Sequence, residues 1–389
     1  MKNFRQGRSF IWGIALLLTW SFPSTAQSIE QLGGISWNLD HKHNSANIER
    51  QEEFYNAVDS LFRNRRDLEY LHNQFSDSAM AKWGDAALIY KIYYSGMYYD
   101  NPEYYKPTLL GVMDIVTGKQ YIAKMAFISR DDTSHNSIQA VYNLLANYDN
   151  IKKKFVFESY TDWYTRDWYK TTIGNISYLK QSEETFNRNE ANALNKFNDS
   201  LAHLFKLPVK KFTYYSCRDV HQMYNVKGAD YVRNMFYARN GGVIENGVVF
   251  SGSNTEYYPH ELVHEYINDL GIASPLRLAN EGIASYLGGS AGLPYQQLLA
   301  VLKKYVLDNN VSPSGLLPEG SMKDINADVS TLYAIGSLLA KLVYEKKGFD
   351  GWKQFLAIPD ADIVSGIGTL LELKQQELDA YLKTQIMKY

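Results

Sequence analysis

The stretch of residues 257–269, YYPHELVHEYIND, is predicted to form a helix, and it decides the expected fold of the second half of the chain. Pro259 suits the first turn of such a helix and Gly271 suits its end. Ser253 or Thr255 is expected to cap its N-terminus. Because residues four apart on a helix project from one face, the two histidine rings of this stretch are expected to lie one turn apart on the same face.

These two residues, His260 and His264, can both direct a ring nitrogen to one metal ion at ~2.0–2.1 Å, the length of a zinc–imidazole bond. Glu261 follows the first histidine and would point to the side of that ion, where a carboxylate can accept a proton from a bound water. Zinc lowers the pKa of its water toward ~7 and polarises a carbonyl. By itself, however, the pattern also fits a surface helix that carries two histidines, so a third ligand is needed to distinguish a zinc site.

A second predicted helix, SPLRLANEGIASYLGG, supplies a third ligand. Ser274 is a cap residue, Pro275 suits the first turn, and the Gly-Gly pair at 288–289 suits the end. Only residues 271–274 separate the two helices, so a tight helical hairpin or corner is expected to bring Glu281 back to the histidines. A catalytic zinc site with two histidines usually adds a carboxylate and leaves the fourth position to water.

With this third ligand, the chain resembles the gluzincin metallopeptidases of the MA clan, which pair His-Glu-x-x-His with Asn-Glu-x-x-Ala on the next helix. Here the second motif is NEGIA, at residues 280–284. Sixteen residues separate His264 from Glu281, slightly fewer than in the aminopeptidase-like members. The metzincin pattern is absent, because Ile267 and Leu270 stand where its glycine and third histidine would be.

The resemblance covers roughly residues 190–389 and is closest to the peptidase-MA-like domains of exported bacterial proteins. It implies a thermolysin-like zincin domain with a small antiparallel-edged sheet, a helix carrying the first motif and a mostly helical C-terminal part. It also implies a role for Tyr333, since YAIGS at residues 333–337 is similar to the Tyr-x-x-Gly-Ala/Ser of aminopeptidase-like gluzincins. In those enzymes the tyrosine hydroxyl stabilises the oxyanion, the kind of contribution a preorganised donor makes.

GVIEN, at residues 242–246, is similar to the Gly-x-Met-Glu-Asn by which those aminopeptidases hold a substrate's free amine. It departs from that motif in two ways: it lies too close to His260 in the sequence, and Ile244 replaces the methionine. Residues 240–246 are therefore predicted to form a turn, followed by an edge strand at 247–253 along which a substrate can pair. Glu245 is left out of the predicted site.

Residues 1–26 are predicted to be a secretory signal peptide. Basic residues are followed by an apolar run over 10–20 and a small-residue cleavage site at 24–26. The apolar run is too short to cross a bilayer core of ~30 Å comfortably, which argues against an uncleaved anchor. No later segment is apolar for long enough to span a membrane, and the mature protein is expected to be periplasmic or secreted.

The 389 residues, 45% of them hydrophobic, are enough for two or three domains with cores of their own. We expect an α+β protein with an N-terminal α+β domain of unknown role at 27–180 and the gluzincin-like domain at 181–389. The first domain is indicated by a helical pattern over 47–75 and a hairpin around 117–119. A net charge of −2 gives no basic excess for a nucleic-acid partner, and a single cysteine excludes an internal disulfide.

The expected function is that of a secreted metallopeptidase with one zinc per chain, acting on a peptide or protein substrate. The zinc ligands would be His260, His264 and Glu281, with Glu261 as the base and Tyr333 at the oxyanion. Endopeptidase and aminopeptidase activity both remain open. The alternative is an exported protein that binds a peptide or glycan and catalyses little, but such a protein would have no use for a base beside three ligands.

Overall fold

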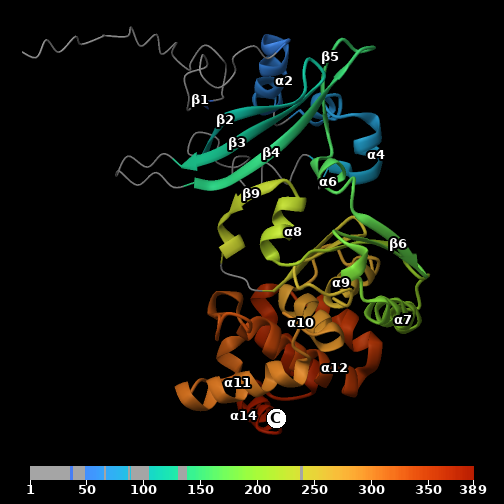
Figure 1. Ribbon diagram of the computed structural model, residues 1–389. Coiled ribbons are helices and arrows are strands. Elements are labelled where there is room, and N and C mark those ends of the chain that lie inside the picture. Colours follow the sequence, from blue (N-terminus) through green and yellow to red (C-terminus); the bar gives the residue numbers. More distant parts are fainter. Residues whose placement is uncertain are drawn as a thin grey trace, which may run out of the picture.

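The computed structural model describes residues 36–37, 49–64, 67–85, 88, 105–129, 138–236 and 240–389. The signal peptide predicted at residues 1–26 lies outside these residues. The fold is α+β, as expected, with two small sheets and a mostly helical C-terminal part (Figure 1). Among the described helices, none combines the length and the apolar character needed to cross a membrane.

The first sheet lies at the N-terminal end of the molecule (Figure 1). Its strands run in the order β1-β2-β3-β4-β5, with β9 also paired to β4, and all pairs except β1–β2 are antiparallel. The hairpin predicted around residues 117–119 joins β2 to β3, and Gly118 takes the positive φ of 71° that its turn requires. The strand bounds are β1 (Ser36–Trp37), β2 (Tyr105–Val116), β3 (Gln120–Ser129), β4 (Ile138–Asp149), β5 (Lys154–Glu158) and β9 (Ala229–Val232).

Short helices cover this sheet. The helical pattern over residues 47–75 forms two helices rather than one, α2 and α3. Phe54 and Phe62 of α2 are fully buried and meet aromatic rings of the sheet edge-on, as the helical spacing of apolar residues predicts. The helices of this half are α2 (Gln51–Arg63), α3 (Leu68–His72), α4 (Asp77–Asp85), α6 (Tyr160–Tyr164) and α8 (Val220–Val226).

The second sheet has the strand order β10-β11-β8-β7-β6. Its three inner strands are parallel, and each outer strand is antiparallel to its neighbour. The domain boundary expected at residue 180 falls between β7 and β8, which are hydrogen-bonded neighbours in this sheet, while β9 from the second half pairs in the first sheet. The strands are β6 (Tyr169–Ile173), β7 (Ile176–Lys180), β8 (Phe212–Ser216), β10 (Gly242–Glu245) and β11 (Val248–Ser251).

The two faces of the second sheet pack against different cores. Because successive side chains of a strand point to opposite faces, Tyr214 lies in the C-terminal core and its neighbour Tyr215 in the N-terminal core. Val249 and Phe250 divide in the same way. Trp83 of α4 covers the N-terminal face, with its ring 6.2 Å from that of Phe250. The sheet therefore joins the two halves of the molecule.

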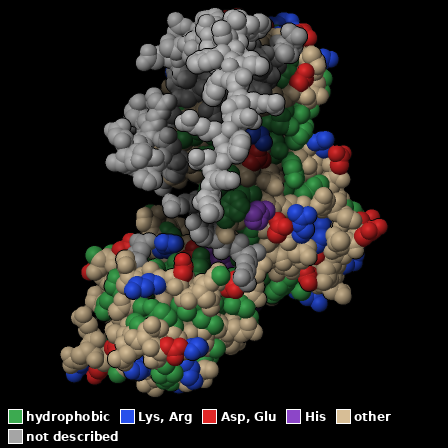
Figure 2. Space-filling view, turned by 60° about the vertical axis from the view of Figure 1, so that its left-hand side comes forward, with side chains coloured by type: hydrophobic (Ala, Val, Ile, Leu, Met, Phe, Trp, Pro, Cys, Tyr) green, Lys and Arg blue, Asp and Glu red, His purple; other side chains and the backbone are tan. Residues whose placement is uncertain are grey.

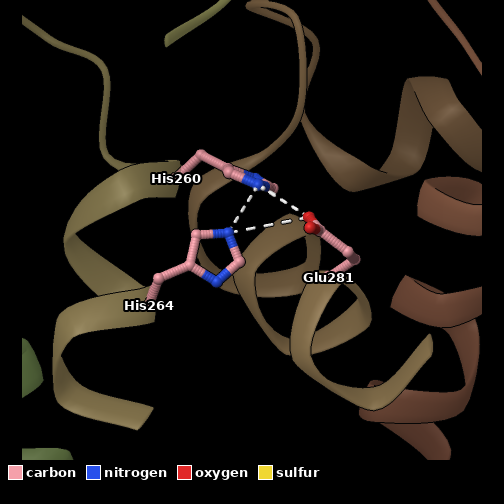
Figure 3. Close-up of side chains that lie close together, drawn as sticks. All are labelled: His260, His264 and Glu281. Carbon is pink, nitrogen blue, oxygen red and sulfur yellow. Dashed lines mark hydrogen bonds and ion pairs between the residues drawn. The ribbon is translucent and has the colours of Figure 1, made fainter. Parts of the chain in front are cut away.

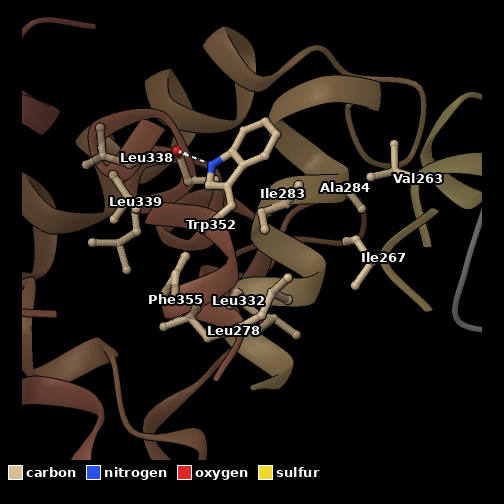
Figure 4. Close-up of a cluster of buried hydrophobic side chains, with 14 of the residues drawn as sticks. Val263, Ile267, Leu278, Ile283, Ala284, Leu332, Leu338, Leu339, Trp352 and Phe355 are labelled. Carbon is tan, nitrogen blue, oxygen red and sulfur yellow. Dashed lines mark hydrogen bonds between the residues drawn. The ribbon is translucent and has the colours of Figure 1, made fainter. Parts of the chain in front are cut away.

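The C-terminal helices form the largest core (Figure 4). At its centre the indole nitrogen of Trp352 donates to the Ala340 carbonyl at 2.7 Å, so the polar edge of this fully buried ring is satisfied.

Acidic and basic side chains are mixed over this part of the surface, as Figure 2 shows for one face. The helices are α7 (Arg188–Phe205), α9 (His260–Asn268), α10 (Arg277–Gly288), α11 (Tyr295–Asn309), α12 (Thr331–Leu356), α13 (Ile363–Leu371) and α14 (Gln375–Ile386). Short 3-10 helices occupy Glu183–Thr185, Arg233–Phe236, Ser314–Leu316, Glu319–Ser321 and Asp360–Asp362.

Candidate metal centre

Two neighbouring helices bring together three side chains of types that can bind a metal ion (Figure 3). His260 and His264 project from one face of α9, and Glu281 projects toward them from α10. The two Nε2 atoms are 3.1 Å apart, and Oε2 of Glu281 lies 3.2 Å from the first and 3.6 Å from the second. The three residues could hold one metal ion, and within the described residues they are the one such group of three or more histidine, cysteine or acidic side chains.

The segment that leads into α9 is fixed by a buried ion pair. The Glu256 carboxylate lies 2.5 Å from the ammonium of Lys180 on β7, and these side chains are 1% and 6% exposed. The same carboxylate accepts hydrogen bonds from the Ser216 hydroxyl and the Asn187 backbone N–H, at 2.7 and 2.9 Å. Because both carboxylate oxygens are used, the charge is satisfied, and the chain reaches His260 from a fixed point on the sheet.

The residues predicted to cap α9 do not cap it. Pro259 directly precedes the helix, which begins at His260 with no side-chain cap. The Thr255 hydroxyl instead donates to the carboxylate of Glu190 at 2.6 Å, and the Ser253 hydroxyl accepts from the Gly241 N–H at 3.3 Å. Both candidates are engaged in holding the preceding loop.

The second helix also begins later than predicted. Ser274 does not cap it, because α10 starts at Arg277 after an extended Leu276, whose N–H donates to the Leu356 carbonyl of α12 at 2.8 Å. The predicted end is confirmed, with Gly289 at φ 75° following the last helical residue.

Glycines set how closely the helices around the site approach. A Cβ on Gly282 would lie 2.4 Å from the carbonyl oxygen of Gly336 on α12, and a Cβ on Gly288 would lie 2.6 Å from the backbone nitrogen of His260. Neither position can accept a side chain without a backbone shift. The residue after Glu281 and the glycine of the YAIGS motif therefore touch directly, which fixes α10 against α12.

Each histidine is oriented by a hydrogen bond on the ring nitrogen that faces away from the cluster. Nδ1 of His260 lies 2.6 Å from the Gly289 carbonyl oxygen, and Nδ1 of His264 lies 2.9 Å from Oδ1 of Asn280. A carbonyl can only accept, so Nδ1 of His260 donates, and the same assignment for His264 makes the Asn280 amide oxygen its acceptor. These two hydrogen bonds favour the tautomer with the proton on Nδ1 in each ring. The lone pair of each Nε2 is then available to a metal ion.

The charges of the site favour an ionised carboxylate beside the histidines. Burial lowers the pKa of His260, but the hydrogen bond to Glu281 and the charges of Glu261 and Glu281 outweigh it and raise this pKa. Burial raises the pKa of Glu281, but the His260 hydrogen bond and the charges of His264 and His260 outweigh it and lower this pKa. The centre is therefore electrostatically suited to a cation.

Glu261 lies beside this cluster, in the first turn of α9, with its side chain buried. Among the described residues, none makes a hydrogen bond or ion pair with its carboxylate. Burial is the main cause that raises the pKa of the nearby phenols of Tyr258 and Tyr333, and the charge of Glu261 adds to it. The site thus combines three ligand atoms with one uncommitted carboxylate.

Tyr333 lies in the first turn of α12. Its ring is edge-on to that of His260, with 5.9 Å between the centroids. Burial, followed by the charges of Glu281 and Glu261, raises the pKa of its phenol to about 12. The hydroxyl keeps its proton at neutral pH, and no described residue accepts a hydrogen bond from it, so it remains free to donate to a ligand.

Tyr258 is a second phenol at the site, and the sequence reasoning did not select it. Its ring centroid lies 6.4 Å from that of His260, and a Cβ on Gly242 would lie 2.6 Å from its ring. Burial and then the charge of Glu261 raise its pKa, while a hydrogen bond from the Ala291 N–H lowers it. Its position two residues before His260 could have indicated a place at the site. Tyrosine is so frequent in this chain, with 31 residues, that nearness in sequence alone did not single it out.

The edge strand is not where it was predicted. Residues 242–245 form strand β10 at the sheet edge, whereas β11, within the predicted edge strand 247–253, lies between β10 and β8. The turn occupies Asn246 and Gly247, at φ 50° and 72°, the positive values of a two-residue hairpin turn. The Asn-Gly pair at 246–247 forms the hairpin turn, whereas the Asn-Gly-Gly at 240–242 leads into β10.

Glu245, excluded from the predicted site, is also remote from it in the structure. Its carboxylate lies 2.5 Å from the ammonium of Lys227, at the C-terminal end of α8. The turn that follows Glu245 is held by the Asn246 side-chain amide, which donates to the Trp83 carbonyl at 2.8 Å.

No family model, curated protein or solved structure matched this chain. The function proposed below therefore rests on the geometry of the site.

Proposed function

We propose that this protein is an exported zinc metallopeptidase of the gluzincin type. Its thermolysin-like domain would hydrolyse peptide bonds of a substrate. The observation that carries the proposal is the convergence of His260, His264 and Glu281, from two helices, beside the uncommitted carboxylate of Glu261. Neither helix alone holds three ligands, so a chance histidine pair on a surface helix does not account for the arrangement.

The three ligand atoms fit zinc in type and in spacing. A circle through them has a radius of about 1.9 Å, slightly less than the ~2.0–2.2 Å bonds that zinc makes to histidine nitrogen and carboxylate oxygen. Two imidazoles and one carboxylate form the ligand set of many catalytic zinc sites, in which a fourth position stays open. When bound, zinc would supply an activated water and polarise the scissile carbonyl.

The remaining chemistry belongs to the protein's own groups. Glu261 is placed to take a proton from the attacking water and then deliver it to the leaving amine. Tyr333 holds its proton at neutral pH, so its hydroxyl can donate to the negative charge that develops on the carbonyl oxygen. The hydrogen bonds from Nδ1 to the Gly289 carbonyl and the Asn280 side chain would hold both imidazoles with Nε2 directed at a bound metal.

The sheet above α9 supplies a place for an extended substrate. Strand β10 is at the edge of the sheet, and its Gly242 lies against the ring of Tyr258, two residues before α9. A polypeptide that pairs with β10 would run along the side of the sheet that leads to the metal centre, held by backbone hydrogen bonds.

Metal content and cleavage test the proposal together. Purified protein should contain about one zinc per chain, and His264→Ala should lose it. His203→Ala is the matched control, because His203 is exposed on α7 and should leave the zinc content unchanged. Zinc retained by His264→Ala would contradict the ligand assignment.

The role of Glu261 is tested by Glu261→Gln, which should keep its zinc and cleave no member of a peptide library that the wild type cleaves. Glu265→Gln, one turn further along α9, is the control and should cleave normally. A wild-type protein that holds zinc but cleaves nothing would instead support the alternative, an exported peptide- or glycan-binding protein.

A further inference from the structure

Proceeding from the proposed peptidase function, we infer that the enzyme cleaves internal bonds of extended polypeptides and makes no use of a free substrate amine. An enzyme that removes N-terminal residues needs an anionic group near the metal to hold the terminal ammonium. Among the residues that the structure describes, the acidic side chains that act on this centre are few, and each has another role or is exposed.

The glutamate of the GVIEN segment lies on the wrong face of the sheet for such a role. Glu245 pairs in register with Val248, and Val243 with Phe250, so these four side chains share one face of the β10–β11 hairpin. Val243, Val248 and Phe250 belong to the N-terminal core. The apolar side chains of α9 belong to the C-terminal core, on the opposite face, so the sheet itself separates Glu245 from the metal centre.

The charge of Glu245 is also neutralised. Lys227 lies 2.5 Å from its carboxylate, and these two side chains are only 9% and 19% exposed. The ammonium also lies 5.3 Å from the centroid of the Phe250 ring. A substrate amine would have to displace a partner that is already held in a sparsely hydrated position.

Of the described residues, Glu261, Glu281 and Asp324 are the acidic side chains whose charges raise the pKa of Tyr258 or Tyr333, after the larger effect of burial. Glu281 is committed to the metal and Glu261 to the proton transfer. Asp324 is exposed, in the loop before α12. An ion pair with an exposed carboxylate is too weak to make a terminal amine a requirement for binding.

Strand β10 offers a substrate the backbone hydrogen-bonding groups of its outer edge. It pairs with β11 on one side, and no other described strand pairs with its outer side. Its four residues, at ~3.3 Å each, present roughly 13 Å of hydrogen-bonding edge, which matches about four substrate residues. Such pairing recognises the middle of an extended chain as well as its end.

The test compares decapeptides of one cleavable sequence, quenched-fluorescent, with either a free or an acetylated N-terminus, and adds single aminoacyl amides. We expect acetylation to change kcat/KM by less than about twofold, single aminoacyl amides to resist cleavage, and first products to come from inside the peptide. A tenfold or greater loss on acetylation, or stepwise removal of single residues, would overturn the inference while leaving the peptidase function intact. If zinc-loaded protein cleaves no peptide, the peptidase function itself fails, and the inference with it.

Two variants locate an amine site if one exists. Glu245→Gln and Asp324→Asn should each alter kcat/KM for the free and the acetylated decapeptide by the same factor. A selective loss on the free-amine peptide in either variant would identify that carboxylate as an amine anchor and overturn the inference.

Discussion

Replacing Gly282 with alanine should loosen the proposed zinc site without changing any of its three candidate ligands. Gly282 follows Glu281 on α10, and its added Cβ would lie 2.4, 2.6 and 2.8 Å from the O, C and Cα atoms of Gly336 on α12. Side-chain atoms could rotate away from such a contact, but these are backbone atoms of a buried helix. The two helices must therefore separate, and Glu281 must move with α10.

The size of the effect follows from two opposing terms. Alanine is a better helix former than glycine by up to ~1 kcal/mol, which stabilises the variant. Overpacking a close contact costs ~1–3 kcal/mol, and a clash with backbone on several atoms belongs at the upper end. We expect a net loss of about 2 kcal/mol, equivalent to roughly 2–3 °C in Tm for a chain of this size. Zinc affinity should fall about 10–100-fold, the range found when groups that orient a ligand are disturbed.

The assay is thermal unfolding together with competitive zinc titration against a chelator. Gly315→Ala is the control, since its Cβ would meet only the Ser312 side chain, at an ordinary 3.7 Å, and should change stability by less than ~0.5 kcal/mol. A Gly282→Ala protein with wild-type Tm and zinc affinity would refute the idea that the glycine contact positions Glu281.

Three further predictions concern the phenol and the buried ion pair. Tyr333→Phe should keep its zinc and lose about 10²–10³ in kcat, the usual cost of removing one oxyanion donor; an unchanged kcat in steady-state kinetics would exclude that role. Because burial and the neighbouring carboxylates raise the Tyr333 pKa to about 12, the phenol stays protonated as pH rises, so the advantage of the wild type over the Tyr333→Phe variant should persist up to about pH 10 in parallel pH–rate profiles. Glu256→Gln strands the buried ammonium of Lys180 and should lower the free energy of unfolding by ~3–5 kcal/mol in urea titrations, whereas Lys180→Met with Glu256→Leu should recover much of that loss.

The sequence predicted that His260, His264 and Glu281 lie together because the signals involved are local. Four-residue spacing on one helix places His260 and His264 together wherever that helix lies, and a short connection returns Glu281 to them. The α+β class, the β2–β3 hairpin and the helical C-terminal part are confirmed on the same local grounds. Assignment of zinc, peptidase activity and the role of Tyr333 stay predictions.

The parts that could not be predicted depend on contacts distant in sequence. Thr255 looks like a helix cap in isolation, but its hydroxyl donates to the carboxylate of Glu190, 65 residues away in the sequence. The pairing of Lys180 with Glu256 spans 76 residues, and no local pattern reveals it. The boundary at residue 180 followed a change of pattern along the chain, whereas β7 and β8 are neighbours because of their place in a sheet. Register and strand order depend on contacts between distant segments, and local patterns in a single sequence give little information about them.

The pairing of β9 with β4 bears on how the protein is made. Strand β4 ends at Asp149, but β9 begins only at Ala229, so the first sheet lacks a strand until roughly 80 more residues have been synthesised. At ~5–20 residues per second, that delay is roughly 4–16 s. Through this interval the residues of β4 that later pair with β9, Ala140 to Tyr142, keep open backbone groups. A nascent chain in that state is a natural client for a holding chaperone, and a stop in translation between the two strands would release a fragment prone to edge-to-edge association.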